Sequence, residues 1–280
     1  MLSSTPADAA AMSACATSGK EPHVVASIVS HGHGRLILDL IQQLQALAEP
    51  CLRRVIVTLN IEEPELMAQL QHVASASFVL QIIQNTTPKG FGCNHNAALQ
   101  TALSHPVTSP ASHVCILNPD ISLLDAHPMA ALTQALNTPA TALAYPLLVD
   151  ADGTRQDNER ELPSFRKLLL RRLFKRTEQR VDWVSGACMM LRANDWLRLR
   201  GFDEQFHMYC EDVDLSLRAR RDIGALVRAQ TRMAHSAQRA SHRQYKHLAW
   251  HLQSLWRLWH LPSFRWALRN PSPVIRSAIE

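Results

Sequence analysis

Short apolar runs and amphipathic stretches alternate along the first half of the chain. Residues 23–29, HVVASIV, form a β-branched apolar run that predicts a strand, and residues 34–48 then carry leucine and isoleucine at helical spacing. The cycle repeats, with strand patterns at 53–60, 78–85 and 113–120 and helical patterns at 64–70 and 94–103. Such alternation predicts right-handed βαβ units, an α/β fold and a mainly parallel sheet with helices on both faces.

The second half of the chain is less regular. Residues 141–165 predict a strand followed by a polar turn around Asp152 and Gly153, and residues 181–195 predict a strand buried enough to line a pocket. The remaining patterns are a basic helix over 166–176, a partial strand within 225–241 and a tryptophan-rich helix from about 242 to 260. We therefore expect a disordered leader over 1–22, one α/β domain over 23–240 and a helical extension over 241–280.

Composition narrows the class of protein. The 280 residues are 46% hydrophobic, which is ample for a buried core, and no apolar run approaches the roughly 18 residues of a membrane-spanning helix. The six cysteines form no C-x-x-C pair, and the N-terminal segment lacks both a basic residue before Lys20 and an apolar block, so it fails as a signal peptide. A cytoplasmic protein is expected. The net charge of +5 suits a phosphate-bearing ligand and an anionic membrane surface equally well.

Polar residues follow the predicted parallel strands. Ser30 and His31 come after the first strand, Asn60 after the second, residues 85–96 after the third and Asn118-Pro119-Asp120 after the fourth. Ligands of open α/β sheets bind at the carboxyl ends of the strands. These loops are therefore expected to converge on one edge and to hold a nucleotide there.

Two glycine-rich stretches are candidates for phosphate contacts. Gly32-x-Gly34 and Gly90-x-Gly92 both lack the third glycine of a dinucleotide fingerprint, because His95 stands at that place in the second stretch, and no P-loop motif occurs. The turn at Gly90–Gly92 would still offer backbone N–H groups to a diphosphate. The alternative is a plain turn followed by capping asparagines.

Two residues are candidate metal ligands. Asp120 ends an apolar strand with the hard oxygen ligands that divalent ions prefer, although an aspartate there also caps turns. His235 either binds a metal or is a histidine satisfied by its loop. His31 and His33 lie two residues apart without a third ligand, and we assign them no metal.

Residues 208–221, MYCEDVDLSLRARR, set three acids ahead of three arginines. Asp214 and Arg218 have the spacing of a stabilising helical pair, and acids in the first turn complement the helix dipole. That interpretation does not explain Glu211 and Asp212, which follow apolar residues directly, as catalytic carboxylates at the edge of a pocket do.

Taken together, these motifs resemble glycosyltransferase family 2, which has the GT-A fold, and within it a bacterial rhamnosyltransferase-like group. The resemblance covers roughly residues 23–245, and its most specific part is WVSGACMMLR followed by GFDEQFHMYCEDVDLSLR. It implies that Asp212 is the catalytic base, assisted by Glu211, and that Asp120 and His235 bind Mn²⁺ or Mg²⁺. Asn118 replaces the first acid of the family's D-x-D signature.

The resemblance also implies the ligands. The donor would be a nucleoside-diphosphate sugar, the acceptor a hydroxyl of a glycan or lipid-linked molecule of bacterial surface polysaccharide, and the displacement would invert the anomeric carbon; no nucleic acid is expected. Residues 23–122 would form the nucleotide-binding half and 123–240 the acceptor half. The implied nucleotide-sugar contacts are Ser30, His31, Asn60, Gly90, Gly92, Asn96, Asn118, Asp120, Trp183, Ser185 and Gly186. The alternatives are a nucleotidyltransferase and a degenerate sugar-nucleotide or anionic-polymer binding protein.

The tryptophan-rich helix leaves two interpretations open. At about 100° per residue, one face is apolar, and Arg243, Lys246 and Arg257 lie on the opposite face. The apolar face comprises Tyr245, Leu248, Leu252, Leu255, Trp256 and Trp259. Packing of that face on the domain is favoured slightly over peripheral attachment to the cytoplasmic membrane surface, for which the basic helix at 166–176 would be a second contact.

Overall fold

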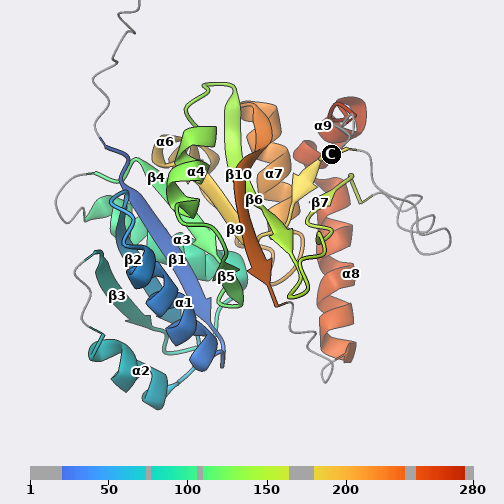
Figure 1. Cartoon of the computed structure of the whole chain (residues 1–280). Helices are drawn as coiled ribbons and strands as arrows, with labels where there is room; N and C mark the ends of the chain where they lie inside the picture. The colour runs from blue at the N-terminus through green and yellow to red at the C-terminus, as the bar shows by residue number, and fades with distance from the viewer. Residues whose placement is uncertain (1–20, 74–76, 106–109, 164–179, 237–243, 275–280) are drawn as a thin grey trace, which may run out of the picture.

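The computed structural model describes residues 21–73, 77–105, 110–163, 180–236 and 244–274, and an eight-stranded sheet runs through it (Figure 1). The strands in their spatial order are β3 (Val79–Gln84), β2 (Leu52–Leu59), β1 (Val24–Ser30), β4 (His113–Leu117), β9 (Cys188–Arg192), β6 (Thr141–Val149), β10 (Ala225–His235) and β5 (Ile121–Leu123). A separate small sheet pairs β7 (Glu159–Arg160) with β8 (Trp183–Val184).

The sheet is mostly parallel, as the alternating pattern predicted. β1 pairs in parallel with both β2 and β4, β2 with β3, and β6 with β10. The antiparallel strand β9 lies between β4 and β6, and β5 runs antiparallel along β10 at the edge. The first four strands thus form a parallel half sheet that continues without a break into the second half.

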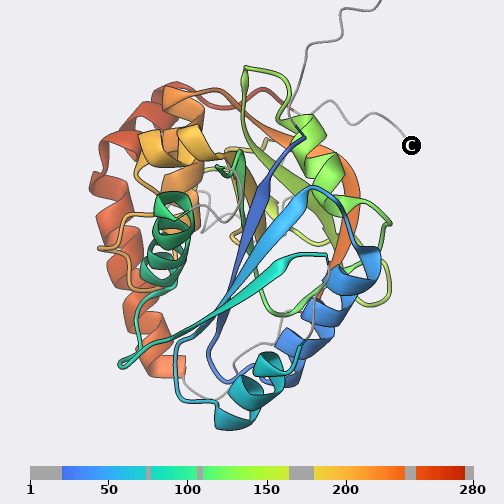
Figure 2. The same ribbon diagram turned by 90° about the vertical axis from the view of Figure 1, so that its left-hand side faces the viewer.

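Side chains of successive strand residues point to opposite faces, and each face has its own core. In β1, Val24, Ala26 and Ile28 belong to one apolar cluster, whereas Val25 belongs to the other. Helices α1 (Arg35–Leu47), α2 (Pro64–Gln71) and α4 (Pro128–Ala135) cover the first face. Helices α3 (Phe91–Ser104), α6 (Ala193–Leu199) and α7 (Glu211–Asp222) cover the second, so the sheet lies between two helical layers (Figure 2).

The C-terminal helices α8 (Gln244–His260) and α9 (Pro262–Arg269) pack outside α7 and form one edge of the molecule in both views (Figures 1 and 2). A third apolar cluster joins them to the domain; it includes Phe206, Val213, Leu217, Leu258 and Phe264. No helix in the described part of the chain is long and apolar enough to cross a membrane.

The structure corrects three details of the predicted elements. Residues 181–195 do not form one strand but contain β8, a turn, β9 and the start of α6, because the chain turns at Gly186 to enter the main sheet. Helix α3 begins at Phe91 rather than at Asn94. The expected leader and the basic helix at 166–176 lie outside the described residues, apart from the last two positions of the leader.

The third correction concerns the face of α8. Leu248, Leu252 and Trp256, predicted to pack inward, are exposed, although Leu255 is buried as expected. Arg257, predicted on the outer face, instead pairs with Asp203 at 2.6 Å. Apolar residues surround most of this helix, so periodicity alone could not decide which stripe docks. The side chains of Tyr245 and Lys246, and the whole of Arg243, lie outside the described part.

Candidate active site

The loop after β1 is held by hydrogen bonds to Ser30 and to Glu63, which precedes α2. Ser30 is fully buried, and its Oγ accepts a hydrogen bond from the N–H of His33. The N–H groups of Gly32 and Gly34 donate to the two carboxylate oxygens of Glu63, each at 3.1 Å. These glycine donors are therefore already satisfied by the protein.

Asn60 organises the loop between β3 and α3. Its Oδ1 accepts hydrogen bonds from the N–H of Lys89 at 2.8 Å and from the side-chain amide of Asn85 at 2.9 Å. Its own amide donates to the carbonyl of Lys89 and lies 3.1 Å from His31 Nδ1. Asn85 continues this chain of amides to Asn94 at 2.7 Å. The expected convergence of His31, Asn60 and the 85–96 loop is therefore present, although Asn85 and Asn94 were not singled out within that loop.

Gly90 and Gly92 allow two segments to approach closely. A Cβ on Gly90 would lie 2.5 Å from the carbonyl oxygen of His207, and one on Gly92 would lie 2.7 Å from Phe202 Cβ. The N–H of Phe91 donates to the same His207 carbonyl at 3.2 Å. Both glycines thus have a packing role at the junction of α3 with the loop before α7, and contact with a diphosphate stays a prediction for them.

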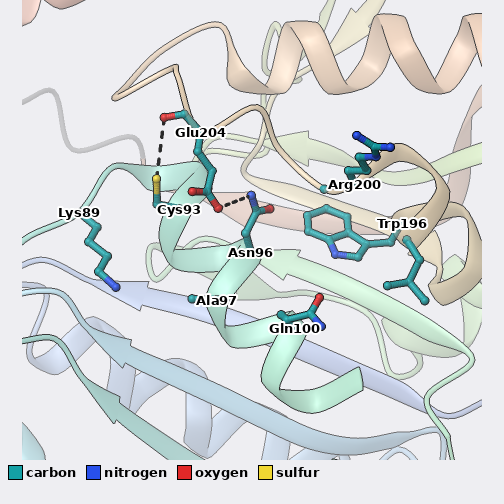
Figure 3. Close-up of a pocket in the computed structure, with 10 residues that line it drawn as sticks. Lys89, Cys93, Asn96, Ala97, Gln100, Trp196, Arg200 and Glu204 are labelled. Atoms are coloured by element: carbon teal, nitrogen blue, oxygen red, sulfur yellow. Dashed lines mark hydrogen bonds between the residues drawn. The ribbon is translucent and has the colours of Figure 1, made fainter. Parts of the chain in front are cut away.

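Asn96 is bound to that same loop. Its Oδ1 accepts the N–H of Phe202, and its amide donates to the Phe202 carbonyl and to Glu204 Oε1, all at 2.9–3.0 Å. Figure 3 shows it in an open pocket of about 540 Å³ along α3, between Lys89 on one side and Trp196 on the other. The amide of Asn96 positions this loop, and its proposed nucleotide contact stays a prediction.

Asp120 and His235 lie side by side although 115 positions separate them. The pairing of β5 with β10 brings Asp120 Oδ1 to within 3.2 Å of His235 Nε2. His235 Nδ1 donates to Gln156 Oε1 at 3.0 Å, and the Gln156 amide donates to the His235 carbonyl at 2.6 Å. This reciprocal pair fixes the ring with Nε2 facing a carboxylate oxygen, an arrangement that requires a proton or a cation between the two atoms.

The donor set fits a divalent ion. Neighbouring ligands of an octahedral ion bound at about 2.1 Å lie roughly 3 Å apart, close to the separation seen here. A carboxylate, and an imidazole oriented through its other nitrogen, are ordinary ligands for such an ion. In the described part of the chain, no third histidine, cysteine or acid completes a cluster, so water or phosphate oxygens would supply the other positions.

Glu211 and Asp212 occupy the first turn of α7. Asp212 Oδ2 accepts the N–H of Gly186 at 3.0 Å, and Oδ1 accepts the N–H of Val213 at 2.8 Å. Glu211 is 6% exposed, and its Oε2 has no hydrogen-bond partner among the described residues. Burial raises the pKa of both carboxyls; for Glu211, burial together with the charge of Asp212 raises the pKa to about 8. A buried and a partly buried acid with raised pKa values are suited to proton transfer.

The backbone before this pair is unusual. Tyr209 and Cys210 adopt left-handed conformations with φ of 72° and 67°, which non-glycine residues rarely adopt. Helix α8 secures this turn: the Tyr209 hydroxyl lies 2.8 Å from His247 Nδ1, and Ser254 Oγ donates to the Met208 carbonyl. Such strain is typical of functional sites whose surroundings hold them in place.

The segment before β9 links the acids to the metal candidates. Gly186 contacts Asp212, and the next residue, Ala187, accepts the N–H of Asn118 at 2.8 Å. Asn118 in turn lies two residues before Asp120. Trp183 and Ser185 belong to the same segment, but the Trp183 indole donates to the Glu161 carbonyl and the Ser185 N–H to the Asn158 carbonyl. The structure thus brings Gly186, Asn118 and Asp212 together; the sugar contacts of Trp183 and Ser185 stay predictions.

No protein-family model matches the chain. Rhamnosyltransferase WbbL of Escherichia coli (strain K12) is 27% identical over 206 residues, which cover 68% of this chain and 74% of that protein. An N-acetylglucosaminyl-diphospho-decaprenol L-rhamnosyltransferase of Mycobacterium tuberculosis (strain CDC 1551 / Oshkosh) is 28% identical over 191 residues, covering 59% of this chain and 62% of that protein.

Solved structures share the fold. The mannosyltransferase PcManGT from Pyrobaculum calidifontis, in complex with GDP-Man and Mn²⁺, has a TM-score of 0.57 at 14% identity and covers 91% of this chain and 66% of that one. Glucosyl-3-phosphoglycerate synthase from Mycobacterium tuberculosis, in complex with Mn²⁺, UDP and glucosyl-3-phosphoglycerate, has a TM-score of 0.57 at 13% identity and covers 85% of this chain and 79% of that one.

The sheet order, the acid pair on α7 and these relatives define a glycosyltransferase with the GT-A fold. Within that class, the chain is similar in sequence to bacterial rhamnosyltransferases. It is therefore an enzyme of sugar transfer, which sets aside the nucleotidyltransferase and the non-catalytic binding protein as interpretations.

Proposed function

We propose that the chain moves a sugar from a nucleoside-diphosphate sugar to a hydroxyl of a lipid-linked glycan acceptor, with inversion at the anomeric carbon and with Asp212 as base. The observation that carries the proposal is the placement of Asp212: two backbone N–H groups fix its carboxylate, beside a buried second acid. A carboxylate held in one orientation and partly withdrawn from water is what proton abstraction from a weak nucleophile needs.

The proposed step is a direct displacement. The acceptor oxygen forms a bond to the anomeric carbon while the bond from that carbon to the diphosphate oxygen breaks, and its electron pair leaves with the nucleoside diphosphate. The acceptor proton goes to Asp212. Burial raises the pKa of this carboxyl, which makes it a better proton acceptor than an ordinary surface aspartate. Glu211 lies beside it, with a buried oxygen that has no hydrogen-bond partner among the described residues.

Asp120 and His235 would hold a Mn²⁺ or Mg²⁺ ion, with Gln156 fixing the histidine ring. When bound, the ion supplies neutralisation of the charge that develops on the leaving diphosphate. Structural neighbours in complex with Mn²⁺ and a nucleotide support this assignment. Asn118 is neutral where the family signature has an acid, so Asp120 is the only carboxylate that this loop contributes.

The names of the relatives support a surface-polysaccharide role. Both relatives are named rhamnosyltransferases. The name of the second also specifies N-acetylglucosaminyl-diphospho-decaprenol, a lipid-linked acceptor. A polyprenol acceptor would lie in the cytoplasmic face of a membrane, so we propose a cytoplasmic enzyme that works at that surface. The donor nucleotide, expected at the edge formed by Ser30, His31, Asn60 and the 85–96 loop, stays to be identified by binding.

The test combines binding with transfer. A thermal-shift panel of nucleoside diphosphates and sugar nucleotides, with and without Mn²⁺, first identifies the donor, because a ligand of the native state raises its stability. Asp212→Asn should then lower turnover at least roughly 10²-fold while leaving donor affinity within error of the parent. Turnover close to that of the parent protein in this variant would remove Asp212 as the base.

A further inference from the structure

An exposed apolar row runs along the outer side of α8. Leu248, Leu252 and Trp256 follow one another at intervals of one helical turn and are 54%, 58% and 66% exposed. Eight large hydrophobic side chains are exposed in the described part of the chain, and four of them, these three and Leu268 of α9, lie on the two C-terminal helices. This clustering is unlike the scattered exposure that is normal for a soluble surface.

The row is not the docking face of the helix. α8 docks through its other side, where Leu258 is fully buried, Ser254 donates to the Met208 carbonyl and Arg257 pairs with Asp203. Leu248, Leu252 and Trp256 therefore face away from the domain. α8 itself forms an edge of the molecule (Figures 1 and 2). Apolar side chains in this position stabilise neither the core nor the helix–domain contact.

The C-terminal stretch that contains α8 and α9 has basic residues but no acidic ones before Glu280. No aspartate or glutamate occurs between Asp222 and Glu280, a stretch with nine arginine and lysine residues and five histidines. The whole chain has a net charge of only +5, so the rest of it is net acidic. Arg265 and Arg269 of α9 are exposed, as the partners of an anionic surface would be.

The size of the row favours a lipid surface over a protein partner. The three side chains of the row, together with the half-exposed Leu268 of α9, offer about 500 Å² of apolar surface, judged from the areas that such side chains bury. A stable protein interface needs roughly 800 Å² on each partner. An amphipathic helix with an apolar row and a basic surround is instead typical of helices that lie in the plane of a bilayer surface.

We propose that the outer face of α8 docks on an anionic lipid bilayer, with Leu248, Leu252 and Trp256 in the headgroup region and the exposed Arg265 and Arg269 of α9 at the lipid phosphates. Membrane docking itself does not depend on the proposed function. Its consequence does: α8 contacts Tyr209 through His247, so docking would hold the turn before Glu211 and Asp212 next to a lipid-linked acceptor.

Co-sedimentation of the full chain with vesicles tests the docking. The chain should pellet with vesicles that contain phosphatidylglycerol at low salt and not with pure phosphatidylcholine vesicles, and half-molar salt should reduce the bound fraction, because surface charges are then screened. The double variant Leu252→Gln/Trp256→Gln should bind at least tenfold more weakly. The matched control is Leu124→Gln/Leu197→Gln, which changes two comparably exposed side chains outside α8 and α9 and should bind like the parent.

Melting temperatures identify any variant that is misfolded. If the parent fails to pellet with anionic vesicles at low salt, or if the α8 variant binds as well as the control, the docking proposal is overturned. Equal loss of binding in both variants would also overturn it, since a specific face would then not be involved.

A transfer assay separates this proposal from the proposed function. The α8 variant should lose transfer to N-acetylglucosaminyl-diphospho-decaprenol in vesicles, but keep transfer to the same head group on a short, water-soluble isoprenoid. Equal activity of the variant and the parent on both acceptors would refute the docking role and leave the glycosyltransferase activity in place. Vesicle binding without transfer to either acceptor, for any donor, would refute the proposed acceptor and leave the docking in place.

Discussion

Replacing Arg218 with methionine should strongly destabilise the domain. Asp214 is 2% exposed, and its two oxygens accept from Arg218 Nε at 2.7 Å and from Ser263 Oγ at 2.9 Å. The guanidinium also donates to the carbonyls of Leu199 and Gly201. Arg218→Met keeps most of the aliphatic stem but leaves a buried carboxylate without its positive partner.

The magnitude follows from the burial of the pair. Removing one member of a buried ion pair costs about 3–5 kcal/mol, because the remaining charge is uncompensated. For a domain of this size that lowers the melting temperature by about 10 °C. The matched control is Arg221→Met on the same helix: Arg221 and Asp222 pair at 2.7 Å with about a third of each side chain exposed, and such a pair contributes about 0–1 kcal/mol.

Thermal and urea unfolding, followed by circular dichroism, measure both variants. Arg218→Met should melt well below Arg221→Met, and the double variant Asp214→Leu/Arg218→Met should recover part of the loss, since no isolated charge remains buried. Similar melting temperatures for the two single variants would show that the buried pair adds little, and the reasoning from burial would be refuted.

Three further predictions concern the site. Gln156→Leu should weaken Mn²⁺ binding by roughly 10–100-fold, because the His235 ring loses its orienting partner; a Mn²⁺-induced thermal shift equal to that of the parent would contradict this. Glu211→Gln should be more stable than the parent near pH 9 and no more stable near pH 4: burial raises the pKa of Glu211 from about 4.5 to about 8, so the folded parent loses stability as pH rises across that window. Unfolding free energies at several pH values measure the difference, and a pH-independent one would refute it. Gly90→Ala should destabilise by about 1–3 kcal/mol, since the new methyl would meet the His207 carbonyl; Gly186→Ala, with 3.5 Å of room, should cost less in the same melt, and the reverse order would refute the steric argument.

The strands and helices of the first half follow the sequence pattern closely, because short apolar runs and amphipathic stretches alternate there with little ambiguity. The placement of β9 does not follow from pattern. Its residues read as a buried strand, but nothing local specifies that it inserts antiparallel between β4 and β6, which depends on the turn at Gly186. The prediction of which face of α8 packs on the domain was wrong for a related reason. The docking of this helix depends on partners distant in the sequence, such as Asp203 and Met208.

The residues of the candidate site that the sequence predicted are the titratable ones within recognisable motifs. Asp212, Asp120 and His235 stood out from the sequence, and the structure gives each a defined partner. Gln156 did not stand out, because a glutamine in a polar turn has no signature of its own. The amide chain through Asn85 and Asn94 was equally hidden, since only folding shows which asparagines of a polar loop face inward.

One feature of the sheet limits how such an enzyme can change its specificity. β9, from the later part of the chain, lies between β4 and β6, while β5, from the earlier part, lies at the far edge along β10. Strands of the predicted donor and acceptor halves therefore alternate within one sheet, and the two halves are not separate units joined by a linker. A chimera that exchanges everything after residue 122 would cut through β5 and would replace β9, the neighbour of β4, and β10, the neighbour of β5. β4 and the retained part of β5 would then have foreign partners. New donors or acceptors are more readily reached by changing the loops at the carboxyl ends of the strands, so recombination between relatives should succeed when breakpoints fall inside those loops and fail at the boundary between the halves.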